Sequence, residues 1–73
     1  MSRFPAVTGK HLTKLLSAKG FSVVRQKGSH CFLRHFDERA TVVPVHSGEV
    51  IGEGLLPRIL KDAKLTKAEL FEK

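Results

Sequence analysis

The residue types best suited to acid–base chemistry at a phosphate lie in four consecutive positions, Lys27-Gly28-Ser29-His30. Histidine has an unperturbed pKa of roughly 6.5 and can therefore take or give a proton near neutral pH. Lys27 and the nearby Arg25 supply positive charge, and backbone N–H groups around Gly28 can form an anion-binding concavity. From spacing alone, a histidine that only closes a turn is the simpler interpretation, so both interpretations stay open at this point.

Two segments rich in β-branched and aromatic residues flank this turn, Phe21–Gln26 and Cys31–Phe36, and together they predict a β-hairpin. Alternation along an extended strand places Arg25 and Lys27 on the same side. The second segment has apolar residues at both parities, so the pattern does not assign its core face. A third segment, Thr41–His46, follows a short polar turn and completes an antiparallel meander.

Pro44 has no N–H to donate, which predicts that the third strand lies at the edge of the sheet or turns this position outward.

A helix is predicted before the strands. Thr8 is a suitable N-cap, and Val7 and Leu12 have the spacing of a hydrophobic staple. Leu12, Leu15 and Leu16 then recur at helical spacing. Gly20 lies where a glycine in the left-handed conformation ends a helix.

The C-terminal third begins with a glycine-rich loop, residues 47–54, and continues with a helical pattern over Leu55–Ala63. Pro57 is compatible with that helix only in its first turn. Thr66 and Glu69 have the spacing of a capping box before a short terminal helix with Leu70 and Phe71. The order helix, three strands, helix, short helix predicts an α+β fold.

The composition indicates a polyanionic partner, because 73 residues carry a formal net charge of +6. An acidic protein partner also fits, and a charge that only keeps the protein soluble is the less favoured alternative. The only cysteine, Cys31, excludes an internal disulfide, and no ligand set predicts zinc or another metal. No apolar run approaches the roughly 20 residues of a membrane span. We therefore expect a cytoplasmic protein with no cofactor and no membrane partner.

An ordered set of motifs extends these observations: Gly20-Phe21, Arg25-Gln26-Lys27-Gly28-Ser29-His30, Val43-Pro44-Val45-His46, Gly54-Leu55-Leu56 and Ile59-Leu60. With these separations the chain resembles the HicA (YcfA-like) toxin family from about Pro5 to Phe71. The resemblance implies one domain over residues 1–73, with a fold similar to the double-stranded RNA-binding domain and helices on one face of a three-stranded sheet. It also implies an endoribonuclease that cleaves mRNA, needs no metal, and is held inactive by a HicB-type antitoxin.

The histidine of the family's Gly-Ser-His motif is His30, and the resemblance assigns it the catalytic role. Arg25 and Lys27 are then candidates for stabilising charge on the phosphate, together with Gly28 and Ser29. The sequence departs from the family pattern in two places: Cys31 replaces a residue that is commonly polar or basic, and Lys64 replaces a glycine that often ends the long C-terminal helix.

The remaining candidates are weaker. His46 matches the family's Pro-Val-His and is either an assistant acid and RNA contact or a strand-end residue. We expect His35 to be a half-exposed strand residue and His11 a surface residue. Cys31 is predicted to be a small buried hydrophobic residue. The pair Glu49 and Glu53 lacks a third metal ligand.

Three other classes of protein are compatible with parts of the chain. A non-catalytic double-stranded-RNA-binding module typically has a lysine cluster at the start of its last helix, whereas residues 54–58 contain one basic residue, Arg58. A DNA-binding helix-turn-helix over Leu55–Ala63 and Thr66–Phe71 would have only Lys67 and Lys73 as cations in its second helix. A small interaction protein with an acidic partner is the third.

Overall fold

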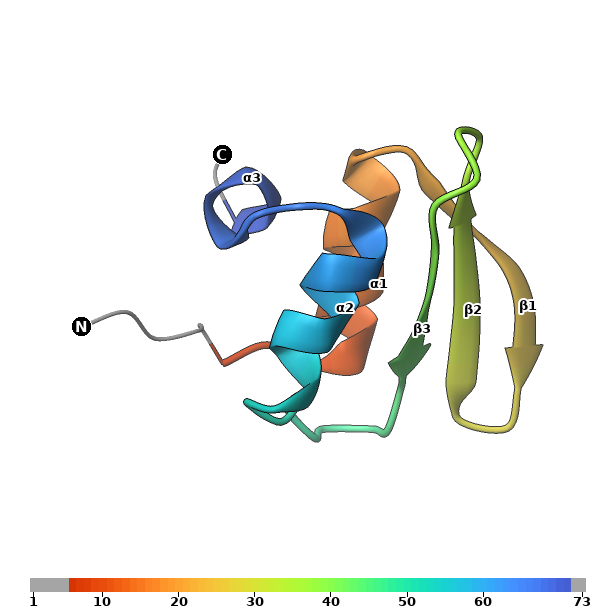
Figure 1. Ribbon diagram of the computed structural model, residues 1–73. Coiled ribbons are helices and arrows are strands. Elements are labelled where there is room, and N and C mark those ends of the chain that lie inside the picture. The colour runs from red at the N-terminus through yellow and green to blue at the C-terminus, as the bar shows by residue number, and fades with distance from the viewer. Residues whose placement is uncertain (1–5, 72–73) are drawn as a thin grey trace.

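The computed structural model describes residues 6–71, so residues 1–5 and 72–73 of the expected domain lie outside it. Three helices and three strands follow one another as α1 (Gly9–Ala18), β1 (Phe21–Lys27), β2 (His30–His35), β3 (Ala40–Pro44), α2 (Leu55–Ala63) and α3 (Lys67–Phe71). The strands form one antiparallel sheet in the order β1-β2-β3, and the helices lie on one of its faces (Figure 1). The predicted α+β fold, similar to the double-stranded RNA-binding domain, is confirmed.

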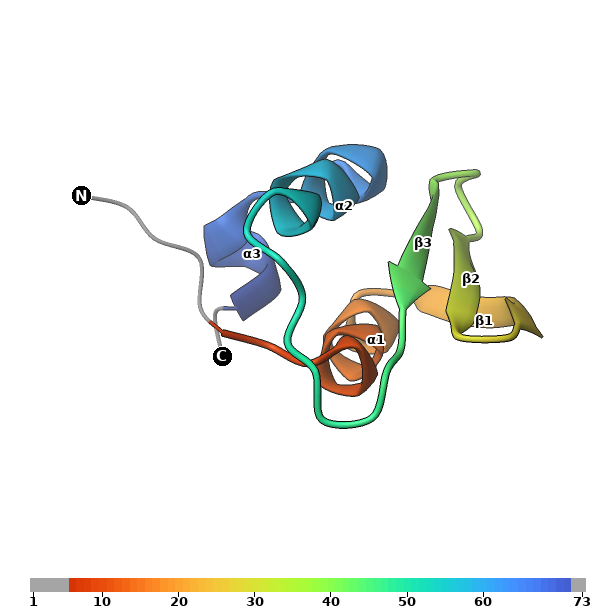
Figure 2. The same ribbon diagram turned by 90° about the horizontal axis from the view of Figure 1, so that it is seen from below.

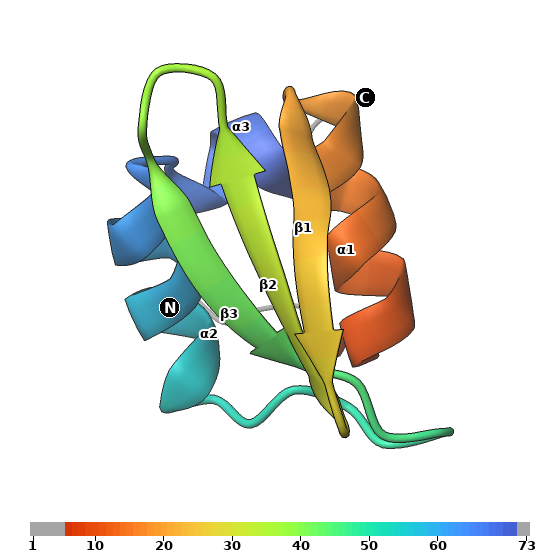
Figure 3. The same ribbon diagram turned by 90° about the vertical axis from the view of Figure 1, so that its right-hand side faces the viewer.

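The side chains of the central strand β2 alternate between the two faces of the sheet. Cys31, Leu33 and His35 are buried beneath the helices, because side chains alternate along a strand. His30, Phe32 and Arg34 therefore point to the other face, which no helix covers in Figure 3. We call this face, away from the helices, the open face. The structure thus assigns the strand face that the sequence pattern left open.

The expectation that His35 is half-exposed is wrong, because its exposed fraction is 7%. Its imidazole packs edge-on to Phe21, with 5.1 Å between ring centroids, and its Nδ1 accepts a hydrogen bond from the Asp37 N–H at 3.2 Å. Gly20 makes room for the ring: a Cβ at this glycine would lie 2.6 Å from the His35 Nε2. A buried polar group with a hydrogen-bond partner is tolerated in a core.

Two strands end earlier than the sequence predicted. β2 ends at His35 rather than Phe36, because a turn closes there with the Glu38 N–H donating to the His35 carbonyl. β3 ends at Pro44 rather than His46, since the chain turns away and the His46 carbonyl accepts from the Glu49 N–H. β3 is an edge strand, as Pro44 predicted.

Helix α1 begins and ends as predicted. The Thr8 hydroxyl accepts a hydrogen bond from the His11 N–H at 3.1 Å, and Val7 and Leu12 are both buried in the core. Gly20 has a φ of +99°, in the region that favours glycine.

The start of α1 lies directly against the end of β3. A Cβ on Gly9 would lie 2.1 Å from the Pro44 carbonyl oxygen, so only glycine allows this approach. The loop after β3 passes the same helix end (Figure 2), where the Ile51 N–H donates to the Val7 carbonyl at 2.7 Å. These contacts join α1, β3 and the loop into one packed unit.

The C-terminal elements also follow the predictions. Pro57 lies in the first turn of α2. Lys64 ends this helix with a φ of 56°, so it adopts the left-handed conformation usual for a glycine at this position. The capping box is present, with the Glu69 N–H donating to the Thr66 hydroxyl at 3.1 Å and the Thr66 N–H to the Glu69 carboxylate at 2.8 Å. Leu70 of α3 completes the core.

A network of polar contacts joins the β2–β3 turn to α2. The Arg39 guanidinium contacts the Asp37 carboxylate at 2.9 Å and donates to the Ala63 carbonyl at 2.6 Å. It also lies over the Phe21 ring, 5.2 Å from the centroid. Hydrogen bonding from Arg39 lowers the pKa of the Asp37 carboxyl below its ordinary value.

The close packing at Gly9 predicts that Gly9→Ala destabilises the fold by about 1–3 kcal/mol, because the new methyl group overlaps the β3 backbone. Helix propensity alone would make alanine more stabilising than glycine at this position, so a loss of stability on substitution would indicate the steric overlap. Denaturant unfolding measures the change. Gly52→Ala is the control, since a Cβ there meets no atom within 4 Å. Equal stability of Gly9→Ala and the native chain would contradict the packing described.

The lowered pKa of Asp37 predicts a pH-dependent contribution to stability. A carboxyl whose pKa is lowered on folding stabilises the fold above its unfolded pKa, near 3.8, and this contribution disappears as the pH falls through the folded pKa. The stability difference between the native chain and Asp37→Asn should therefore be largest above about pH 5 and should shrink as the pH falls below about 4. The exposed loop variant Glu53→Gln serves as the control. A difference that does not depend on pH would show that Asp37 acts through packing alone.

Candidate active site on the open face

The hairpin between β1 and β2 fixes the position of His30. Lys27 and His30 are paired directly across a two-residue loop, and Gly28 has a φ of +58°. A positive φ at the first loop residue alone is the pattern of a type II′ turn, which favours glycine there. The Ser29 carbonyl accepts a hydrogen bond from the Val45 N–H at 2.6 Å, which ties the loop to the chain after β3.

A β-bulge at Val24 determines which way the basic side chains of β1 point. Val23 pairs with Leu33, whereas the next paired residue, Arg25, stands opposite Phe32, so Val24 is an extra residue in β1. Simple alternation from the buried Phe21 would have put Arg25 on the helix side of the sheet. The bulge moves Arg25 to the open face.

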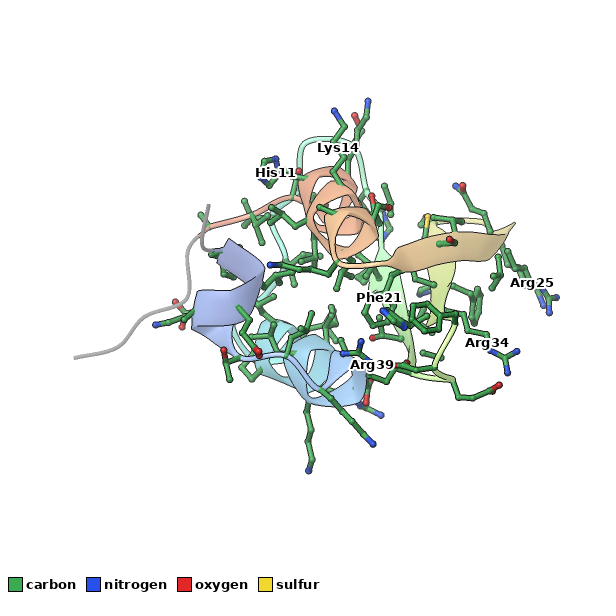
Figure 4. The ribbon with its side chains drawn as sticks, turned by 90° about the horizontal axis from the view of Figure 1, so that it is seen from above. His11, Lys14, Phe21, Arg25, Arg34 and Arg39 are labelled. Atoms are coloured by element: carbon green, nitrogen blue, oxygen red, sulfur yellow. The ribbon has the colours of Figure 1, made fainter. Side chains whose placement is uncertain are left out.

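The predicted shared side of Arg25 and Lys27 is confirmed, and it is the side of His30. Directly opposite residues of antiparallel strands share a face, so Lys27, His30 and Pro44 form one row across the open face. The next rows are Arg25, Phe32 and Val42, and then Ser22, Arg34 and Ala40. Figure 4 shows Arg25 and Arg34 on the sheet side, whereas His11 and Lys14 extend from α1.

A hollow of about 670 Å³ lies along β3 and reaches α2. Its lining residues are Val24, His30, Phe32, Leu33, Arg34, Glu38, Ala40, Thr41, Val42, Pro44, Leu55, Arg58, Ile59 and Asp62. A volume of this size is in the range of small-molecule sites. We call it the β3 hollow. His30 lies at its hairpin end, exposed to solvent.

Charge is unevenly distributed along the open face. Lys27 and Arg25 lie in the rows of His30 and Phe32, and neither row contains a carboxylate. Farther along, Arg34 is paired with Glu38 in an exposed ion pair, and Asp62 of α2 lines the same hollow. The hairpin end therefore attracts an anion more strongly than the opposite end does.

His46 and His30 line different hollows, although Pro44 lines both. His46 is exposed and lines a different hollow of about 240 Å³ with Glu49 and Val50, whereas the β3 hollow does not include it. Its suggested role as an assistant stays a prediction. His11 is exposed on α1, as expected. Cys31 is buried on the helix side, which confirms the prediction that it is a small core residue.

Sequence reasoning missed two parts of the site. Phe32 and Val42 lie on the open face beside His30, but both had been interpreted only as strand residues. Their exposure depends on the face assignment of β2, which the alternation pattern did not give. Arg58 and Asp62 of α2 reach the hollow through tertiary packing, and no local signal in the sequence indicates it.

Within residues 6–71, no three His, Cys, Asp or Glu side chains gather closely enough to hold a metal ion. None of the helices in the same range has both the length and the apolar character required to cross a bilayer.

The comparisons with known proteins support the family resemblance. The family model of the HicA toxin of bacterial toxin–antitoxin systems matches residues 9–65, which is well over half of the chain and includes the hairpin, β3 and α2. A search of curated proteins returns no match. The extent of the family match, with the fold it requires, shows that this chain belongs to the HicA toxin family.

Proposed function

We propose that this protein is an endoribonuclease that cleaves mRNA without a metal ion, with His30 as its catalytic residue. One observation carries the proposal: in a chain of the HicA family, the hairpin exposes His30 beside Lys27 on a basic face of the sheet. Because mRNA is the proposed substrate, the proposed place of action is the cytoplasm.

Cleavage of RNA without a metal uses the 2′-hydroxyl of the substrate as nucleophile. Removal of its proton lets the 2′-oxygen attack the adjacent phosphorus, the bond to the 5′-oxygen breaks, and the leaving oxygen takes up a proton. His30 takes or gives one of these protons, and a positioned histidine typically accelerates such steps ~10²–10⁴-fold. Its exposure lets a phosphodiester approach the imidazole directly.

Positive charge beside His30 stabilises the phosphorane that forms during the attack. Lys27 is the direct cross-strand neighbour of His30, and the bulge at Val24 directs Arg25 to the same face. Cations placed where negative charge develops often make the largest contribution to catalysis. Backbone N–H groups at Gly28 and Ser29 complete the phosphate-binding group that we propose.

A toxin of a toxin–antitoxin pair has an antitoxin as partner, and we propose a HicB-type protein here. To inhibit the reaction proposed above, such a partner must block access to His30. The exposed open face offers the surface for this contact.

The alternative is a non-catalytic double-stranded-RNA-binding module, which shares the order of elements. Such modules typically have a lysine cluster at the start of the helix that follows the sheet, which here is α2. The first turn of that helix contains Arg58 as its single basic residue, with Leu55 and Leu56 packed into the core cluster. The basic rows of the sheet favour the nuclease.

The proposal predicts that His30→Ala abolishes cleavage while the fold and the affinity for RNA stay nearly unchanged. A long single-stranded RNA is incubated with the native chain and with the variant, with EDTA present throughout. His11→Ala is the matched control, because His11 is an exposed histidine on α1. His46→Ala, assayed in parallel, tests the assistant role.

Cleavage by His30→Ala at the native rate would refute the assigned mechanism. Loss of native cleavage in EDTA, with recovery on adding a divalent cation, would refute metal independence. Binding of RNA by both chains without cleavage by either would support the RNA-binding module.

Arg25→Ala and Lys27→Ala should each weaken both cleavage and RNA binding. Each should also reduce the slope of log affinity against log salt concentration by about 0.7, the value for one lost contact with a single-strand phosphate. Binding titrations over a range of salt concentrations measure the slope. Lys14→Ala is the control, because this exposed lysine lies on α1 (Figure 4). An unchanged slope for Arg25→Ala and Lys27→Ala would mean that neither side chain contacts a phosphate.

A further inference from the structure

The open face has an aromatic ring next to its candidate catalytic histidine. Phe32 follows His30 by two positions on the same face of β2, so the two side chains project in parallel about 7 Å apart at the backbone. No helix covers the ring, which is half-exposed and lines the β3 hollow with His30. Its cross-strand neighbour Val42 is also exposed, at 37%.

A cation accompanies this ring. The Arg25 guanidinium lies 5.8 Å from the Phe32 ring centroid, at the outer limit of a cation–π contact. The pairing of Arg25 with Phe32 exists because of the bulge at Val24. A flat ring with a guanidinium over one face, and a lysine in the next row, has the composition of a surface that binds single-stranded nucleic acid.

We propose that Phe32 is a stacking platform for an unpaired nucleobase of the RNA, next to the phosphate that His30 engages. The inference rests on the proposed function and specifies its substrate as a single-stranded segment. Within one nucleotide the phosphate and the base are separated by a distance similar to that between His30 and Phe32. A phosphate at the hairpin end therefore brings its own base or the adjacent one over the ring.

Stacking on Phe32 requires a base that is not stacked within a helix. In duplex RNA the bases are paired and stacked on one another, and proteins contact mainly the backbone and the 2′-hydroxyl groups. The open face is therefore suited to loops and unpaired stretches of RNA. Arg25 lies over one face of the Phe32 ring, so the base stacks on the other face, with the apolar Val42 as its neighbour in the same row.

The chain contains no tryptophan, so Phe32→Trp introduces a single fluorescent indole at the proposed platform. The variant is combined with His30→Ala to keep the RNA intact. A short single-stranded RNA oligonucleotide of mixed sequence should quench the indole fluorescence on binding, because a base stacks on the ring. The same oligonucleotide annealed to its complement should quench it much less.

Phe32→Ala, also combined with His30→Ala, should bind the single strand roughly tenfold more weakly or worse, as expected for the loss of one stacked base. Phe36→Ala is the matched control, since Phe36 is 89% exposed beyond the end of β2 and outside the β3 hollow. It should leave the affinity unchanged. Binding is followed independently by the fluorescence anisotropy of an end-labelled RNA.

Unchanged indole fluorescence with saturating single-stranded RNA would overturn the proposal, as would native affinity in the Phe32→Ala variant. Either result, with cleavage still dependent on His30, would leave the nuclease function standing without a stacking platform at Phe32. Quenching by single strands, together with failure of the native chain to cleave RNA, would support the platform and refute the nuclease.

Discussion

Burial of alternate residues along β2 is the constraint on which the site depends. Cys31, Leu33 and His35 lie beneath the helices, and the period of two in an extended strand then sends His30 and Phe32 to the opposite face. A shift of one residue in this strand would bury the histidine and expose the core. The helices thus fix the direction of side chains that they do not touch.

Strand β1 directs its basic side chains to the open face by means of an irregularity, the bulge at Val24. Phe21 must be buried at one end of β1, whereas Arg25 and Lys27 face solvent beside His30 at the other. An unbroken alternation cannot satisfy both demands, and the extra residue Val24 resolves the conflict. Bulges of this kind commonly redirect side chains near functional sites.

The sequence predicted most of the fold because its signals are local. Thr8, Gly20 and the Thr66–Glu69 box each depend on residues within one turn, and each formed as expected. The burial of His35 was not predictable, since it depends on the space above Gly20, fifteen positions away in the chain. The bulge gave no signal either, because valine is common in regular strands. His30, Lys27 and Arg25 were identified from their types and from the family resemblance, whereas Phe32 required the face assignment.

The core cluster contains residues that are synthesised early and residues that are synthesised late. Leu70 of α3 packs in one hydrophobic cluster with Leu12 of α1, so the cluster contains residues from both ends of the described chain. An isolated hairpin is marginally stable in water, and the β1–β2 hairpin gains support from α1, which packs on β1, and from its neighbour β3. A nascent chain that stops before residue 70 therefore lacks Leu70, one of the residues of this core cluster. The core cluster is therefore completed only after α3 has been synthesised.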